Sequence, residues 1–255
     1  MSDTTIEWTD KTWNPTRGCS RISPGCEHCY AERQATRMIH GPYQGLVRST
    51  PNGPRWTGVV RLADHKTLQA PLHWRNPRRI FVNSMSDLFH ERLDNSHVDQ
   101  VFEVMHHASW HTYQILTKRA DRMHDYVNGA KWPTVPWIWL GVSVENQEYA
   151  DLRMPILLNT PAAVRFVSVE PLLGPVDLTP WLSKIDWVIV GAESGPGARP
   201  MNEKWVRALR DQCVQAGVKF FYKQRLDERG RKMSLPVLDG RQWSQWPSEP
   251  RGSSA

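Results

Sequence analysis

Short apolar runs separated by helix-forming segments constrain the fold of this chain more than any other feature. The runs start roughly 20 to 35 residues apart, near residues 79, 111, 137, 163, 187 and 218. That spacing is the length of one strand with its following helix. The runs are apolar throughout, which is typical of parallel strands covered on both faces. With one further strand before residue 17, the pattern predicts an α/β fold, a partial (βα)6–7 TIM-like barrel with parallel strands.

The intervening segments carry helix signals. Expected helices begin at Tyr30 and at the cap of residues 94–96, follow the runs at 111 and 137, and span Asn202 to Gly217. We expect residues 1–224 to form the barrel and 225–255 a C-terminal extension. Residues 40–78, rich in Gly, Pro, Trp and Arg, are an irregular insert within the barrel. The closing Gly-Ser-Ser-Ala is expected to be disordered.

Polar residues follow the apolar runs, where parallel strands end. VSVE occurs twice, at residues 142–145 and 167–170. In βα barrels the face formed by these strand ends carries the active site. The plainer interpretation is that strands end in polar residues simply because they reach the surface. The residues concerned are Ser84, Ser86, Asp87, Thr117, Lys118, Ser143, Glu145, Asn146, Ser168, Glu170 and Glu193.

Composition favours a globular protein with an anionic partner. The formal net charge is +6, and thirteen tryptophans are present. An ordinary basic enzyme would have the same balance. Residues 1–17 lack the apolar core of a signal peptide, and the longest apolar stretch, 135–144, is too short to span a bilayer. We therefore expect a cytoplasmic protein with no membrane partner.

Three of the four cysteines, Cys19, Cys26 and Cys29, lie within eleven residues in the spacing C-x6-C-x2-C. In a reducing compartment such a cluster indicates metal binding or catalysis. Cys29 immediately precedes a predicted helix, whose N-terminus favours thiolate charge.

Two kinds of metal site remain open for this cysteine loop. A closed zinc site would need a fourth ligand from Cys213, His28 or His40. Such a protein would be a zinc-stabilised, non-catalytic nucleic-acid-binding module. Alternatively, three cysteines hold a [4Fe-4S] cluster with one iron free for a small molecule. Cys213 falls on the apolar face of the last predicted helix, so we expect it to be a core residue.

The loop resembles that of the radical S-adenosylmethionine (SAM) superfamily. Those enzymes place three cysteines after the first strand of a partial βα barrel, most often as C-x3-C-x2-C. This chain departs in the six residues after Cys19 and in His28 at the usual aromatic position, with Tyr30 next. The chain is also similar to a phage- and prophage-associated three-cysteine family and to photolyase-like radical enzymes that repair DNA. The phrases that carry this likeness are WTDKTWNPTRGC, LTKR, GVSVEN, SVEPLLGP and IVGAESGPGARP.

The resemblance implies a function and a set of site residues. Cys19, Cys26 and Cys29 would ligate the cluster, and SAM would be cleaved reductively to a 5′-deoxyadenosyl radical. By position, Ser84, Ser86 and Asp87 would contact the SAM amino group. Lys118, Ser143 and Glu145 would contact its ribose and carboxylate, and Gly191, Ala192 and Glu193 its adenine. Tyr30 and Glu170 complete the implied cofactor site.

The implied partners are SAM, an electron donor such as flavodoxin or ferredoxin, and a nucleic acid or nucleotide that is modified or repaired. The insert and the segment before it supply basic residues interleaved with tryptophan, a combination that suits phosphate contacts and base stacking. The basic residues are Arg33, Arg37, Arg48, Arg55 and Arg61.

Overall fold

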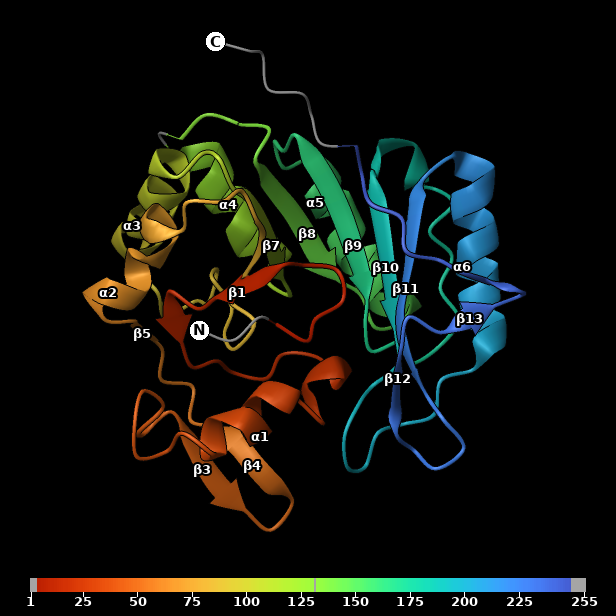
Figure 1. The fold of residues 1–255 in the computed structure, drawn as a ribbon, viewed down its shortest axis with the longest axis horizontal. Coiled ribbons are helices and arrows are strands. Elements are labelled where there is room, and N and C mark those ends of the chain that lie inside the picture. Colours follow the sequence, from red (N-terminus) through yellow and green to blue (C-terminus); the bar gives the residue numbers. More distant parts are fainter. Residues whose placement is uncertain (1–3, 131, 249–255) are drawn as a thin grey trace.

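A curled sheet of eight strands forms the centre of the protein, in a computed structural model that describes residues 4–130 and 132–248 (Figure 1). The first seven strands in spatial order are mutually parallel, and the last is antiparallel to its neighbour. The order is β1 (Lys11–Trp13), β6 (Arg79–Val82), β7 (Thr112–Thr117), β8 (Ile138–Ser143), β9 (Val164–Val169), β10 (Trp187–Gly191), β11 (Lys219–Leu226) and β12 (Lys232–Ser234). The predicted α/β class with parallel strands is confirmed, and its form is a half-barrel.

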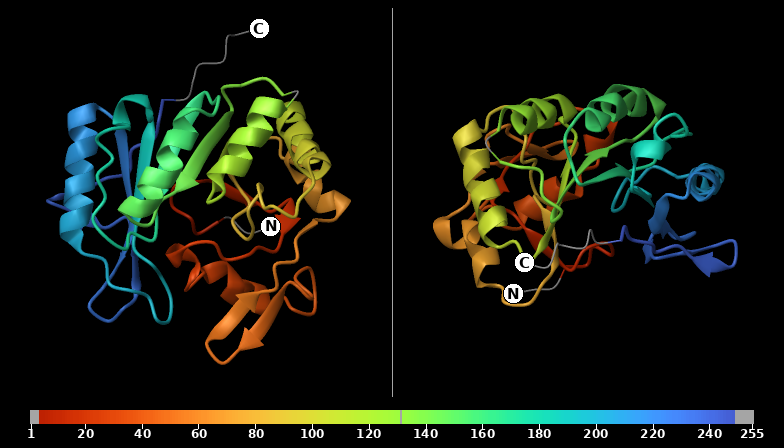
Figure 2. Two further views of the ribbon diagram at one scale, coloured as in Figure 1. Left: turned by 180° about the vertical axis from the view of Figure 1, so that it is seen from behind. Right: turned by 90° about the horizontal axis from the view of Figure 1, so that it is seen from above.

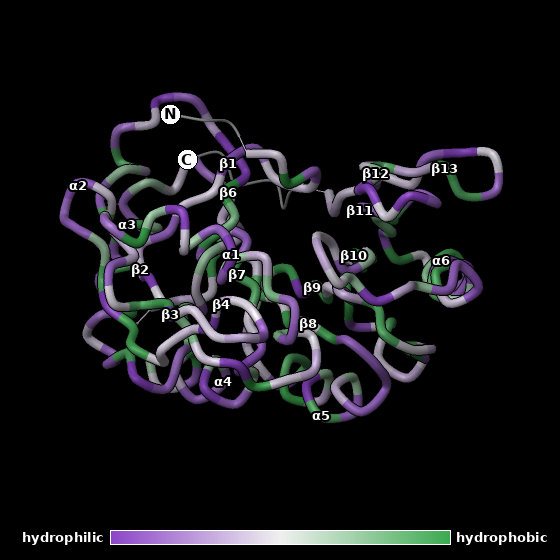
Figure 3. Tube along the Cα trace, turned by 90° about the horizontal axis from the view of Figure 1, so that it is seen from below, coloured by the Kyte–Doolittle hydropathy of each residue, from purple (hydrophilic) through white to green (hydrophobic). Residues whose placement is uncertain are grey.

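Helices cover the convex face of this sheet, as the views from above and below show (Figures 2 and 3). They are α3 (Asn95–His107), α4 (Ala120–Gly129), α5 (Gln147–Leu158) and α6 (Glu203–Ala216). Caps set their ends as the sequence predicts. Asn146 and Asn202 each accept a backbone N–H of the first turn, and Gly217 ends α6 with a left-handed φ of 70°. The link from β9 to β10 contains only the short 3-10 helix η3 (Leu182–Lys184).

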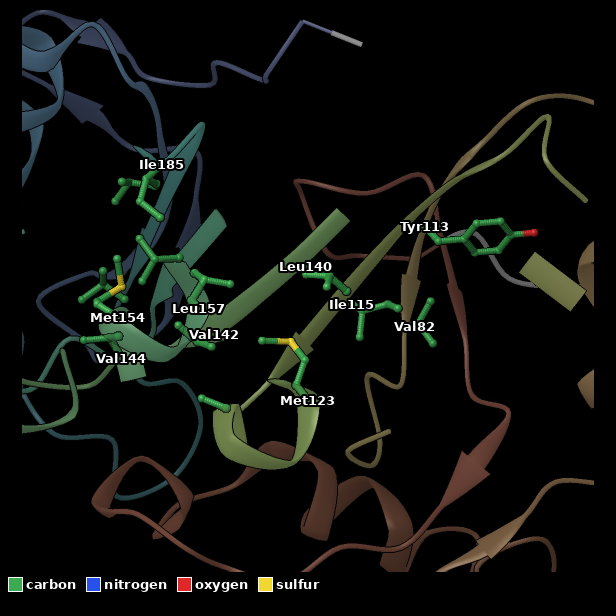
Figure 4. Close-up of a cluster of buried hydrophobic side chains, with 14 of the residues drawn as sticks. Val82, Tyr113, Ile115, Met123, Leu140, Val142, Val144, Met154, Leu157 and Ile185 are labelled. Atoms are coloured by element: carbon green, nitrogen blue, oxygen red, sulfur yellow. The ribbon is translucent and has the colours of Figure 1, made fainter. Parts of the chain in front are cut away.

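The main core lies between the sheet and these helices (Figure 4). Strand residues such as Val82, Ile115 and Leu140 meet Met123 of α4 and Met154 of α5. All five side chains are at most 3% exposed. Burial of this continuous apolar layer is the main stabilising contribution to the fold.

A second, aromatic cluster fills the concave side of the sheet. Its largest members are Trp8, Phe81, Trp139, Phe166, Trp187 and Phe221. These side chains alternate along the strands with those that face the helices. The strands are therefore buried on both faces, which explains why their sequences are apolar without alternation.

The terminal segments lie across the open side of the half-barrel. Among the described residues β1 and β12 are not paired with each other. Instead, the Trp246 indole N–H donates to the Trp8 carbonyl at 3.5 Å, and its ring packs 5.0 Å from that of Phe221. Lys232 Nζ lies 2.7 Å from a carboxylate oxygen of Glu7. Side chains from both chain ends thus join across the opening that strand pairing leaves.

Smaller elements cover the ends of the strands (Figure 1). The cysteine loop contains η1 (Pro24–Cys26) and leads into α1 (Tyr30–Thr36). The expected irregular insert contains ordered elements, above all a hairpin of two strands. The elements are β2 (Thr16–Arg17) paired with β5 (Arg61–Leu62), the hairpin β3 (Val47–Thr50) and β4 (Gly53–Trp56), α2 (His65–Leu68) and η2 (Ala70–His73).

The predicted boundary at residue 224 falls inside β11. Beyond it, β12 pairs with β11, and β13 (Val237–Leu238) pairs with β14 (Arg241–Gln242). Leu238 and Trp243 belong to the main core. The closing Gly-Ser-Ser-Ala lies outside the described residues. Across the described chain, every helix is too short or too polar to cross a membrane.

Candidate functional site

A cavity of about 670 Å³ lies where the parallel strands end. Its volume is in the range of small-molecule and cofactor sites. Twelve of the predicted site residues line it: Cys19, Cys26, Cys29, Tyr30, Ser84, Ser86, Asp87, Lys118, Ser143, Glu170, Ala192 and Glu193. The structure therefore brings together residues that the sequence spreads over 175 positions.

The cysteine loop is joined to the sheet by a tight backbone contact at Gly18. This residue has a φ of 91°, and a Cβ here would lie 2.1 Å from the carbonyl oxygen of Val59. Gly18 also forms a parallel bridge with Ser86, just beyond β6. Only glycine satisfies both the φ and the space, so Cys19 starts from a defined position.

The three thiols are half-buried and face the cavity. Burial raises the pKa of Cys19 and Cys29 above the usual thiol value. The Arg119 guanidinium opposes this effect at Cys19, and backbone N–H groups at the start of α1 oppose it at Cys29. Thiolates here therefore require a positive partner beyond what these groups supply.

Residues that would complete a closed zinc site lie elsewhere. Cys213 is fully buried in the main core, as predicted. His28 lies beside Gly197 in the loop after β10, and His40 is exposed. Within the residues described, no group of three or more His, Cys, Asp or Glu side chains is arranged to hold a metal ion.

Glu145 lies fully buried behind the cavity wall and supports the cysteine loop. One carboxylate oxygen pairs with Lys118 and accepts a 2.7 Å hydrogen bond from Ser23 in the loop. The other accepts from Arg153 at 3.0 Å. Burial acts to raise the pKa of Glu145, but Lys118 and Arg153 hold it below its usual value, so the group is ionised.

Asp87 and Arg119 form a second buried network beside Cys19. Arg119 Nη1 lies 3.0 Å from Asp87 Oδ2 and 3.9 Å from the sulfur of Cys19. Asp87 also accepts from the Thr117 hydroxyl at 2.7 Å and from the Lys118 backbone N–H at 3.2 Å. The carboxylate thereby orients Arg119 toward the loop.

Other predicted site residues pair with one another around the cavity. Glu170 accepts a 2.5 Å hydrogen bond from Lys223, and Glu193 pairs with Arg199. The Tyr30 hydroxyl donates to the Ser84 carbonyl at 2.5 Å. Gly191 lies in the wall, where an added Cβ would come within 3.2 Å of the Glu170 carboxyl carbon. Most charges on the wall are thus balanced within the protein.

The comparison with protein families covers nearly the whole chain. Residues 3–247 match the family described as a protein of unknown function, DUF5131. The chain belongs to the DUF5131 family. No curated protein and no solved structure matches it.

Two polar groups in the cavity wall of this DUF5131 protein are buried without a hydrogen-bond partner among the described residues. They are the Ser168 hydroxyl and the indole N–H of Trp8. A buried polar group without a partner is costly, so such atoms indicate where a ligand would bind. Ser168 is the serine of the second VSVE, and that repeat was its only signal in the sequence.

Arg119 and Lys223 are further cavity residues of the DUF5131 chain that the sequence alone did not single out. Arg119 stands directly after β7 in the LTKR phrase, where only its position marks it. Lys223 lies within β11, so its side chain enters the cavity from a strand interior.

Proposed function

We propose that this DUF5131 protein is a radical SAM enzyme that acts on a nucleic acid or nucleotide. The observation that carries the proposal is the opening of Cys19, Cys26 and Cys29 onto one cavity with the polar ends of the strands. Three cysteine ligands leave one iron of a [4Fe-4S] cluster free for a small molecule. The volume of about 670 Å³ leaves room for a ligand beside the cysteines.

The roles of the protein groups follow from their surroundings. Cys19, Cys26 and Cys29 would hold the cluster, which with SAM bound supplies a 5′-deoxyadenosyl radical by reductive cleavage. Arg119, 3.9 Å from the sulfur of Cys19, offsets thiolate charge at that ligand. The unpartnered Ser168 hydroxyl is available to bind SAM or substrate.

The walls of the cavity suit a reaction that must be kept from water. Trp8, Phe81 and Leu116 line it from the aromatic cluster on the concave side of the sheet. Apolar walls exclude solvent and offer few hydrogen-bonding groups to compete with the substrate. The implied electron source is a small redox protein such as flavodoxin or ferredoxin.

The test is anaerobic purification followed by reconstitution with iron and sulfide. The proposal predicts a brown protein that converts SAM to 5′-deoxyadenosine when dithionite is added. Cys26→Ala should lose both the colour and the product, and Cys213→Ala, a core substitution outside the loop, should retain both.

Two other results would replace the proposal. A colourless protein with one equivalent of zinc would favour the non-catalytic nucleic-acid-binding module. A brown protein that leaves SAM intact would be an iron–sulfur protein of another class.

A further inference from the structure

The positive charge of the protein is concentrated in one segment beside the cavity. Residues 33–63 contain no Asp or Glu. They contain five arginines: Arg33, Arg37, Arg48, Arg55 and Arg61. Elsewhere basic and acidic residues are interleaved, so this segment accounts for most of the formal net charge of +6.

No carboxylate of the described residues neutralises these arginines. Arg33 bonds to the Ser194 carbonyl at 2.7 Å, Arg55 to the Glu27 carbonyl at 3.1 Å, and Arg61 to the Gln44 carbonyl at 2.5 Å. Arg37 and Arg48 are exposed and make no hydrogen bond or ion pair within the described part of the chain. The contrast with the balanced cavity wall is sharp, since Lys118, Lys223 and Lys232 there all pair with glutamates.

Two of the arginines face each other across the hairpin. Arg48 of β3 and Arg55 of β4 are direct cross-strand partners. Like charges in that arrangement are destabilising unless an anion lies between or beside them. The pair therefore favours a ligand with negative charge on this face of the hairpin.

The hairpin is joined to the cysteine loop. The buried Glu32 of α1 accepts from the backbone N–H of Trp56 at 2.9 Å and from Arg21 in the loop at 2.9 Å. Trp56, at the end of β4, lines the cavity. In Figure 1 the hairpin and α1 lie together beside the ends of the strands. A polyanion on the hairpin would thus lie close to the cavity mouth.

We propose that α1 and the β3–β4 hairpin form a phosphate-binding arm that holds the backbone of a nucleic acid strand, with one nucleotide directed into the cavity. Arginines without carboxylate partners suit phosphates, which accept bidentate hydrogen bonds from guanidinium groups. An acidic peptide is the less favoured occupant, since the adjacent cavity with its aromatic wall fits a planar base. The proposal rests on the proposed function only in where the strand leads.

The test is binding of short fluorescent oligonucleotides to the full chain, measured by anisotropy over a range of salt concentrations. The variant Arg37→Ala/Arg48→Ala removes two exposed charges that make no contact in the protein. We expect about tenfold weaker binding and a smaller salt dependence of log K, by about 0.7 per lost contact on a single strand. Single-stranded DNA, RNA and duplex DNA of one sequence distinguish the sources of phosphate.

The matched control is Lys184→Ala/Lys219→Ala, which removes two exposed charges near the opposite ends of the strands. It should bind as the unmodified protein does. Equal effects of the two double variants would overturn the proposal, because net charge alone would then account for binding. Tighter arm-dependent binding of poly-glutamate than of any oligonucleotide would also overturn it. The measurement needs no cluster, so failure of the radical SAM proposal leaves its result unchanged.

Discussion

The hydroxyl of Ser23 donates a 2.7 Å hydrogen bond to the carboxylate of Glu145, which lies 122 residues further along the chain. This bond ties the cysteine loop to the end of β8. It also changes the role expected of Glu145, because both carboxylate oxygens already have partners within the protein. The loop is therefore held by a buried ionic network as well as by its own turns.

Replacement of Glu145 by alanine should destabilise the protein by about 3 to 5 kcal/mol, because Lys118 and the buried Arg153 would lose their counterion. Urea unfolding measures the loss. Glu148→Ala, in the exposed part of α5, is the control and should change stability by less than about 0.5 kcal/mol. Similar stability of the two variants would show that the network is not formed in solution.

Gly25→Ala should distort the cysteine loop, because the new Cβ would lie 2.4 Å from Cγ of Glu145. Overpacking of this kind costs about 1 to 3 kcal/mol. A lower melting temperature and less bound iron after reconstitution are expected. Gly129→Ala, at the end of α4 with open space around it, should leave both unchanged. A Gly25→Ala protein with full iron content would mean that the loop shifts freely.

Arg119→Ala should leave the buried Asp87 without its guanidinium partner, at a cost of about 3 to 5 kcal/mol. A double-mutant cycle with Asp87→Asn isolates the pairwise contribution. We expect the double variant to lose less stability than the sum of the single variants. Additive losses would show that the two side chains do not interact.

Ser168→Ala should leave folding stability within about 0.5 kcal/mol of the unmodified protein, because its hydroxyl has no partner among the described residues. If the hydroxyl binds SAM, the affinity of the reconstituted protein should fall by up to about tenfold. Calorimetric titration measures the affinity. The exposed Ser183→Ala is the control. A clear loss of stability would mean that Ser168 has a structural partner after all.

Acid should weaken the contact between the two chain ends. Burial acts to raise the pKa of Glu7, but hydrogen bonds from Lys232 and Ser234 lower it below its usual value. A lowered pKa in the folded state adds stability above the ordinary pKa of about 4.5, and this is lost as the pH falls through the lower value. Glu7→Gln should thus be about 1 kcal/mol less stable than the unmodified protein at pH 7, and this difference should shrink near pH 3.

Urea unfolding at the two pH values measures this difference. Glu228→Gln, an exposed change of the same kind, should show no such dependence. A gap between Glu7→Gln and the unmodified protein that is equal at both pH values would exclude a titrating contact at Glu7.

Local pattern determined the succession of strands and helices. Apolar runs at the spacing of strand–helix units, caps such as Asn202 and a glycine such as Gly217 act within a few residues, so each predicted element was found close to its expected bounds. The burial of Cys213 followed from helical periodicity for the same reason.

Tertiary packing decided which polar strand ends are free and how the sheet closes. Glu145 and Ser168 occupy equivalent places after and within two copies of one sequence phrase, yet the first is fully bonded and the second has no partner among the described residues. Likewise, Trp246 reaches the Trp8 carbonyl from 238 positions away. Such pairings depend on side chains brought together by the curl of the sheet, and short-range sequence patterns carry no information about them.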